Sequence, residues 1–217
     1  MTSNRFHWVT FDVRSLLPAN WQEEILGVAK KFAQRKILVT RHSTSREARD
    51  DYHLPTQTVG GEELAIHLPW LRRMYEQDFR LLAQATTSEP VSLMSDPRFA
   101  IALNVQQGSD RYECHVDTNP IEGLLYVTTH REGDGGELIV SNRGQAHSVE
   151  EVNEDASIIE PKAGYLLFFD GRNHSHYVAP MNNPNGLRVV VGMNYYVPSW
   201  TEEKRPEDLN KHLSGYN

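Results

Sequence analysis

The segment "YECHVDTNP" contains His115-Val116-Asp117, a histidine and a carboxylate separated by one residue. On a β-strand, residues two apart point to the same face, so both side chains can reach one metal ion from one side. A His-x-Asp/Glu pair also arises by chance, and His130-Arg131-Glu132 is a second example in this chain. That second pair lies beside "GDGG", which is typical of a solvated turn, so we favour His115 and Asp117 as metal ligands.

A further histidine downstream makes the metal hypothesis more specific. The segment "FFDGRNHSHYVAP" contains His174 and His176, which share strand parity, so parity does not decide between them. Two histidines and one carboxylate with open coordination positions form the ligand set of non-haem Fe(II) oxygenases. A 2-oxo acid can chelate the metal through two oxygens, and O2 can take the last position.

An arginine stands at the distance that such a cosubstrate requires. 2-Oxoglutarate has a far carboxylate that must be fixed, and arginine is the side chain suited to a two-point contact with it. Arg188, in "GLRVVVGMNYYV", lies near the start of a predicted strand, twelve residues after His176. The residues therefore predict sites for Fe(II) and for 2-oxoglutarate, with O2 as the second cosubstrate.

Several segments in a fixed order resemble one known family. They are "HVDTNP", "LLYVTTH", "DGGELIV", "PKAGYLLFFDGRNHSHYVAP" and "NGLRVVVGMNYY", and together they cover roughly residues 100–197. The sequence resembles the 2-oxoglutarate- and Fe(II)-dependent dioxygenases, on the side nearest the prolyl-hydroxylase-like members. The resemblance implies a double-stranded β-helix, which is a jelly-roll core, with N-terminal helices packed on it.

The resemblance also implies residue roles. His115, Asp117 and His176 match the iron ligands, and the pattern x-V-x-P after the distal ligand favours His176 over His174. Arg188 and Tyr126 match the residues that hold the far carboxylate of 2-oxoglutarate.

One position departs from the family pattern. Prolyl-hydroxylase-like members often place another tyrosine on the strand before His-x-Asp, where "IALNVQQG" offers Asn104 or Val105. We expect Asn104 to hydrogen-bond the cosubstrate.

The resemblance favours hydroxylation or desaturation and leaves the substrate open. Related halogenases replace the ligand carboxylate with Gly or Ala, whereas Asp117 is present here. A weaker resemblance of "HVDTNPIEGLLY" to enzymes that hydroxylate or halogenate free amino acids suggests a small polar substrate. The candidate substrate contacts are Tyr112, Thr118, His174, Asn194 and Arg41, with Arg41, His42 and Arg46 on a polar loop expected to act as a lid.

Two alternatives stay open at this point. One is a prolyl-type hydroxylase of a protein side chain, which would need an open groove rather than an enclosed polar pocket. The other is a cupin-like jelly roll that binds a metal or ligand without oxygenase activity. His174-x-His176 is similar to a cupin His-x-His pair, but cupins then have a glutamate a few residues on, where this chain has Pro180.

Hydrophobic periodicity predicts the elements that position these residues. Asn20, with Glu23 three residues on, predicts a capped amphipathic helix in "NWQEEILGVAKKFAQRK", and Pro69 predicts the start of a second helix. "ILVT" at 37–40 predicts a short strand. Further strands are predicted at 98–106, 111–117, 123–130, 136–141, 156–160, 164–170, 175–179 and 187–197.

These elements predict a mainly β protein with N-terminal helices. We expect a single domain over 1–217, with a helical support region at 1–96, a double-stranded β-helix core at 97–200 and a polar tail at 201–217.

Composition limits the partners of the chain. The net charge of −7 argues against nucleic acid as the main partner, because binding a phosphate backbone depends on Lys and Arg. The one cysteine, Cys114, excludes an intramolecular disulfide and a thiolate-rich metal site. With no apolar membrane segment or signal-peptide core, we expect a cytoplasmic protein that acts on a small molecule. Nothing in the sequence assigns an oligomeric state.

Overall fold

Two antiparallel sheets form the centre of the protein. The computed structural model describes residues 7–39, 44–47, 53–206 and 209. In the larger sheet the strand order is β1-β10-β7-β12-β5-β3-β2, and β4 also pairs with β12. The smaller sheet has the order β6-β11-β8-β9. Two sheets with this antiparallel pairing form a jelly-roll core, as expected from the sequence.

The strands of the larger sheet come from both halves of the chain. Their bounds are β1 Trp8–Asp12, β2 Gln34–Val39, β3 His53–Val59, β4 Ser92–Leu93, β5 Ile101–Gln107, β7 Ile121–Tyr126, β10 Tyr165–Phe169 and β12 Leu187–Tyr196. Those of the smaller sheet are β6 Tyr112–His115, β8 Leu138–Ser141, β9 Ala156–Ile159 and β11 His176–Val178.

Strict alternation gives the larger sheet two different faces. On β12, Val189, Val191 and Met193 belong to a buried apolar cluster on the outer face. Their neighbours Arg188, Val190, Gly192 and Asn194 line a cavity on the inner face. Because successive strand residues point to opposite faces, one strand serves both the core and the cavity. The same alternation holds on β5 and β7.

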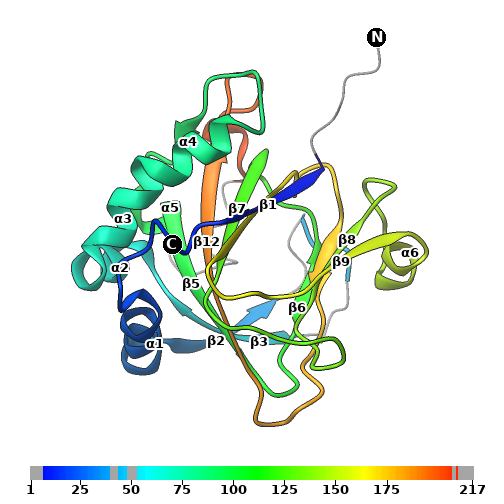
Figure 1. Cartoon of the computed structure of the whole chain (residues 1–217). Helices are drawn as coiled ribbons and strands as arrows, with labels where there is room; N and C mark the ends of the chain where they lie inside the picture. Colours follow the sequence, from blue (N-terminus) through cyan, green and yellow to red (C-terminus); the bar gives the residue numbers. More distant parts are fainter. Residues whose placement is uncertain (1–6, 40–43, 48–52, 207–208, 210–217) are drawn as a thin grey trace.

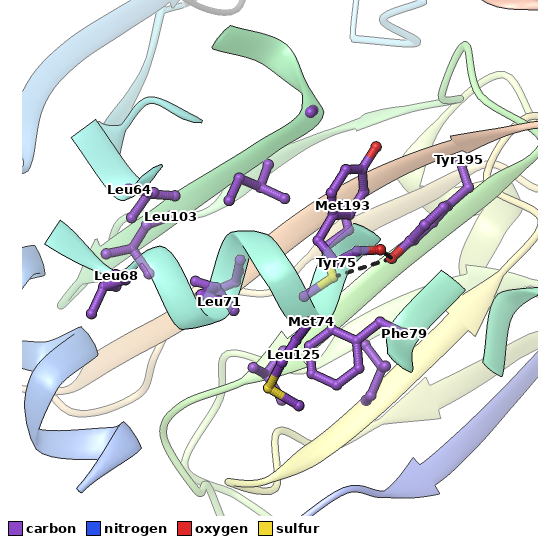
Figure 2. Close-up of a cluster of buried hydrophobic side chains, with 14 of the residues drawn as sticks. Leu64, Leu68, Leu71, Met74, Tyr75, Phe79, Leu103, Leu125, Met193 and Tyr195 are labelled. Carbon is purple, nitrogen blue, oxygen red and sulfur yellow. Dashed lines mark hydrogen bonds between the residues drawn. The ribbon is translucent and has the colours of Figure 1, made fainter. Parts of the chain in front are cut away.

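Helices cover the outer face of the larger sheet. They are α1 Trp21–Phe32, α2 Gly61–His67, α3 Pro69–Glu76 and α4 Asp78–Gln84, and Figure 1 shows them on the side of β5 and β12 away from β8 and β9. Figure 2 shows Tyr75 of α3 beside Met193 and Tyr195 of β12, and the centroids of the two tyrosine rings are 4.9 Å apart. The Tyr75 hydroxyl donates to the carbonyl of Asn194 (2.8 Å) and accepts from the amide of Met94 (3.0 Å). The helical layer therefore fixes the far end of β12.

The smaller sheet covers the inner face. Side chains from both sheets form a second apolar cluster beside the cavity, made of Leu124, Tyr126, Leu138, Val140, Ile159, Leu167, Phe169, Val178 and Val190. Helix α6, Val149–Asn153, and a third small cluster that contains Cys114 lie on the outer side of this sheet.

The strands of the second half lie close to their predicted positions. All eight are present, but the first begins later than predicted, because Pro97–Ala100 form the short helix α5 before β5. Asp96 caps that helix by accepting from the amide of Arg98 (3.0 Å).

The first half contains more strand than predicted. Strands β1, β3 and β4 were not predicted, and all three join the larger sheet, so residues 1–96 contain strands as well as helices. Strand β3 reads "HLPTQTV", in which polar residues hide the strand pattern. Its pairing with β5 is a tertiary contact that sequence periodicity does not encode.

Three helix predictions need correction. Helix α1 ends at Phe32, and the residues predicted to continue it form β2 instead. Asn20 precedes α1, but its side chain makes no capping hydrogen bond. The helix predicted to start at Pro69 does start there, with Pro in its first turn, but it breaks at Gln77 into α3 and α4. Helix α2 was not predicted. The last element described in full is the 3-10 helix Glu202–Lys204.

None of the helices in the described part of the chain has the length and apolar character needed to cross a membrane.

Candidate metal and cosubstrate site

The structure brings His115, Asp117 and His176 together. Their ligand atoms all lie within 4.8 Å of one another. The Nε2 atom of His115 is 3.2 Å from one carboxylate oxygen of Asp117, and Nε2 of His176 is 3.5 Å from the other. His115 ends β6 and His176 begins β11, and the two are direct partners across the smaller sheet. Antiparallel pairing therefore joins residues that are 61 positions apart in the chain.

Both histidines are held in the same orientation. Nδ1 of His115 lies 2.8 Å from the carbonyl oxygen of Glu113, and Nδ1 of His176 lies 2.9 Å from that of His174. In each case the carbonyl belongs to the residue two positions earlier. A carbonyl only accepts, so each Nδ1 carries a proton, which leaves Nε2, the atom that faces Asp117, as the one available to a metal. This is the tautomer that a metal-binding imidazole needs.

The electrostatics of the three side chains suit a cation. Burial raises the pKa of Asp117, but the charge and hydrogen bonds of His176 and His115 outweigh it and hold that pKa below its usual value. Burial lowers the pKa of His115, and the nearby carboxylate of Asp117 reverses this and raises it. Asp117 is therefore an ionised carboxylate facing two imidazoles in a largely buried site, where a divalent cation is the favourable occupant.

Gly171 makes room for the carboxylate. A Cβ atom at this position would lie within 3.1 Å of three atoms of the Asp117 side chain. The backbone also connects the two, because the amide of Asp117 donates to the carbonyl of Gly171 (2.9 Å). Gly171 was not singled out in the sequence, so its close approach to the candidate metal ligand was missed.

His174 lies apart from the three ligands. Its ring stacks on His7 with 4.0 Å between centroids, and its Nδ1 is 2.8 Å from the carbonyl oxygen of Ser141. The shared parity of His174 and His176 does not apply, because β11 begins only at His176. His174 is not among the residues that line the cavity, but its carbonyl oxygen accepts from Nδ1 of His176.

Arg188 and Tyr126 lie together near one end of the cavity. Arg188 is buried, with its Nε donating to the carbonyl of Gly136 (2.9 Å) and its Nη1 to the side-chain oxygen of Gln106 (2.8 Å). Three buried polar atoms here have no hydrogen-bond partner among the described residues: Nη2 of Arg188, the hydroxyl of Tyr126 and Nε2 of Gln106. Unpaired buried donors are costly, so this cluster fits an absent carboxylate.

Burial also shifts the pKa values of this pair. It raises the pKa of Tyr126 to about 12, with the nearby guanidinium acting in the opposite direction. It lowers the pKa of Arg188, again against the interaction with Tyr126. The hydroxyl therefore stays protonated and can donate to a bound carboxylate.

Gln106 is a site residue that sequence reasoning missed. It lies directly opposite Arg188 across β5 and β12, and it shares strand parity with Asn104. Once Asn104 was a candidate, the residue two positions later on the same face was a candidate by the same rule.

One cavity of about 280 Å³ joins the three ligands to Arg188. Of the predicted contacts, Tyr112, Thr118, Asn104 and Asn194 line it. The side chain of Asn194 also donates to the carbonyl of Phe99 (2.7 Å), and the ring of Tyr112 lies 5.0 Å from that of His115. Arg41 and His42 lie outside the described residues.

Residues 44–47 run beside the ligand strand. The amide of Val116 donates to the carbonyl of Thr44 (3.0 Å), and Ser45 forms a β-bridge with His115. Arg46, the described member of the expected lid, instead donates to the side chain of Gln145 (3.0 Å).

In the rejected pair Glu132 lies exposed on the Gly-rich loop at 132–136, as expected, whereas His130 does not. His130 is buried, and its two ring nitrogens lie 2.8 and 3.0 Å from the carbonyl oxygens of Gly135 and Leu187. It holds the Gly-rich loop against the start of β12 and takes no part in the ligand cluster.

Comparison with known proteins agrees with this site. Residues 100–196 match the model of the 2OG-Fe(II) oxygenase superfamily, a span that contains the three ligand candidates, Tyr126 and Arg188. No curated protein sequence matches the chain.

Solved structures of similar fold cover most of the chain. HygX from Streptomyces hygroscopicus, with nickel and 2-oxoglutarate bound, has a TM-score of 0.61 at 12% identity and covers 92% of this chain and 86% of its own. A prolyl hydroxylase from Trichoplax adhaerens, in complex with a peptide of hypoxia inducible factor, has a TM-score of 0.61 at 14% identity, covering 93% and 87%. The 2-oxoglutarate-dependent epimerase SnoN has a TM-score of 0.59 at 16% identity, covering 93% and 83%.

At these identities the structures show a shared fold, and the family match supplies the chemistry. The described residues fit the cofactors of that family, because an imidazole–carboxylate cluster faces a cavity with an unsatisfied arginine. The cofactors are Fe(II) and 2-oxoglutarate. Over residues 100–196, which contain the candidate ligands, the chain is similar to the 2OG-Fe(II) oxygenase superfamily.

Proposed function

We propose that this protein hydroxylates an unactivated C–H bond of a small polar molecule, with free amino acids as one candidate class. The balanced reaction converts substrate, 2-oxoglutarate and O2 into hydroxylated substrate, succinate and CO2. The observation that carries the proposal is the cluster of His115, Asp117 and His176, with both Nε2 atoms turned to the carboxylate.

In this proposal these three side chains hold Fe(II). When bound, Fe(II) and 2-oxoglutarate together activate O2 for attack on the C–H bond. The chain contributes ligation and orientation: the carbonyls of Glu113 and His174 fix the two imidazoles, and Gly171 leaves space for the carboxylate.

The far carboxylate of 2-oxoglutarate is assigned to the Arg188 cluster. Nη2 of Arg188, the Tyr126 hydroxyl and Nε2 of Gln106 supply three donors that lack partners among the described residues. A carboxylate accepts several such bonds, and charge-assisted bonds to arginine are the strongest of them. Asn104, the neighbour of Gln106 on the same face, is a further candidate contact.

Cavity size supports a small substrate over a protein side chain. Its volume of about 280 Å³ lies just below the range for small-molecule sites, about 300–1,000 Å³, and the cavity must hold the cosubstrate as well. Asp117 supports hydroxylation over halogenation, because it leaves no ligand position for a halide. A prolyl-type hydroxylase is the alternative, and assays with proline-containing peptides beside free amino acids separate the two.

The first test is a spectrum rather than an activity. Purified protein is mixed with Fe(II) and 2-oxoglutarate without O2, for wild type, His176→Ala and the matched control His174→Ala. We expect a metal-to-ligand charge-transfer band in wild type and in the control, and none in His176→Ala. A folded wild-type protein with no band would contradict the proposal, and loss of the band in His174→Ala alone would reassign the ligand.

A further inference from the structure

A carboxylate that binds neither cofactor faces the same cavity. Glu122 lies on β7, and alternation places it on the inner face with Leu124. One of its oxygens accepts from the side-chain amide of Asn119 (2.8 Å), which also donates to the carbonyl of Ile121 (2.9 Å). Asn119 belongs to the turn after Asp117, so the segment that carries the metal ligand also positions Glu122.

Glu122 and Arg188 lie at opposite ends of the cavity floor. Glu122 is paired across the sheet with Asn194, which lies six residues from Arg188 on β12. At roughly 3.3 Å per residue, that separation is about 20 Å along the strand. The floor therefore has a buried cation where the far carboxylate of 2-oxoglutarate is assigned and a carboxylate at the other end.

The charge of Glu122 has no partner in the described part of the chain. Burial and the negative charge of Asp117 raise the pKa of Glu122 well above its ordinary value, and hydrogen bonds from Asn119 and the backbone of Met193 lower it by less. No ion pair to Glu122 is formed by the described residues, although Arg98 and Arg205 also line the cavity. A carboxylate in such a place is stabilised by a cation that enters the cavity.

Space and hydrogen-bonding groups surround this carboxylate. Gly192, across from Leu124, carries no side chain, and a Cβ atom there would lie 3.1 Å from Oε1 of Glu122 and 3.6 Å from Nδ2 of Asn104. The side-chain amide of Asn194, the partner of Glu122 across the sheet, lies on the same face. Amide oxygens and a carboxylate are the acceptors that a protonated nitrogen, with two or three N–H donors, requires.

We propose that Glu122 binds a cationic nitrogen of the substrate, an ammonium or guanidinium group, and so selects basic small molecules. This inference rests on the proposed function, because it assigns the substrate to the cavity that the metal ligands share. Glu122 is a specificity residue here: the charged contact fixes one end of the substrate and thereby determines which C–H bond lies near the metal.

The test uses probes in matched pairs. The cationic probes are L-lysine, L-arginine and n-butylammonium, and their neutral counterparts are L-norleucine, L-citrulline and 1-butanol. Each is titrated against the complex of protein, Fe(II) and 2-oxoglutarate without O2, and the dissociation constant is obtained from thermal stabilisation. The same pairs are then tested in air for substrate-stimulated succinate.

Three variants accompany wild type. Glu122→Gln removes the charge at nearly constant shape, Glu122→Asp keeps the charge on a shorter side chain, and Glu132→Gln makes the same chemical change on the exposed Gly-rich loop. We expect at least one cationic probe to bind wild type more tightly than its neutral counterpart. Glu122→Gln should weaken that probe about 10- to 100-fold, the range for a charge-assisted hydrogen bond, and Glu132→Gln should not.

The outcomes separate this inference from the proposed function. No charge-transfer band in folded wild type would contradict the proposed function itself. A wild-type protein that shows the charge-transfer band but binds no cationic probe more tightly than its neutral counterpart would overturn only the role of Glu122. The same conclusion would follow if Glu122→Gln preferred the cationic probe as strongly as wild type does. If Glu122→Gln does not fold, the Glu122→Asp variant decides the question. Tighter binding of the cationic probe than of its neutral counterpart by Glu122→Asp supports the inference, and equal binding of the two probes overturns it.

Discussion

His115 and His176 are paired residues on adjacent strands, with 4.3 Å between ring centroids and with each Nδ1 facing the carbonyl oxygen two positions earlier on its own strand. The two imidazoles therefore have the same local geometry although they come from distant segments. Asp117, just beyond the end of β6, lies between their Nε2 atoms. The proposed metal site is thus a property of the strand pair, and the predictions below test it and its surroundings.

Replacing the bridging carboxylate should remove metal binding. In Asp117→Asn the shape is retained but the negative charge that faces both imidazoles is lost. We expect the affinity for Fe(II) to fall at least about 10-fold, as for other changes that affect ligand charge and orientation. Equilibrium dialysis with metal analysis measures this, with Asp134→Asn on the exposed loop as control. Equal metal content in both variants would place the metal elsewhere.

Adding one methyl group beside that carboxylate should have a similar effect. In Gly171→Ala the new Cβ would overlap the side chain of Asp117, which must then leave its position between the histidines. We expect metal affinity to fall about 10- to 100-fold. Gly27→Ala is the control, because a Cβ on that exposed helix position meets nothing within 4 Å. Metal binding by Gly171→Ala at the wild-type level would refute the close approach.

Removing the unpaired hydroxyl of Tyr126 should weaken the binding of 2-oxoglutarate without lowering the stability of the protein. Tyr126→Phe deletes a buried polar atom that has no partner among the described residues, so the protein without 2-oxoglutarate should unfold at the same or a higher temperature. The KM for 2-oxoglutarate should rise about 10-fold, because a hydrogen bond to a charged group is lost. A lower melting temperature with unchanged KM would show that the hydroxyl has a structural role instead.

Stability without metal should depend on pH through Glu122. Its pKa in the folded state is raised, by burial first and then by Asp117, so the folded protein binds a proton that the unfolded chain releases at lower pH. This stabilisation is complete below the unfolded pKa of about 4.5 and is lost as pH rises through the folded value. Glu122→Gln lacks it, so the melting temperature of Glu122→Gln minus that of wild type should increase from pH 5 to pH 8. Glu132→Gln should show a constant difference, and a constant difference in Glu122→Gln as well would contradict the raised pKa.

Much of the site followed from short-range sequence information. The spacing His115-x-Asp117 and the position of Arg188 indicated a site for Fe(II) and 2-oxoglutarate, and the order of the matching segments carried the resemblance to the family. Strand alternation fixes the face of Arg188 and Asn194 within β12, whereas Asp117 lies beyond the end of β6. The eight strands of the second half were likewise visible, since turn residues separate short apolar runs.

Other features depended on contacts between distant segments. His174 and His176 could be separated only by knowing where β11 begins, since parity holds only inside a strand. Gln106 and Glu122 acquire their roles from the register of β12 against β5 and β7, which the sequence of one strand does not contain. Strand β3 forms because β5 offers it an edge, so its polar sequence gave no signal.

The sequence by itself determined which chemical groups this protein has and which of them share a strand face. Only the tertiary structure decided which faces meet, because pairing and register between strands are set by packing over the whole chain. That is why His115, Asp117 and Arg188 could be identified from local pattern, whereas the space at Gly171 and the position of Glu122 at the far end of the cavity could not.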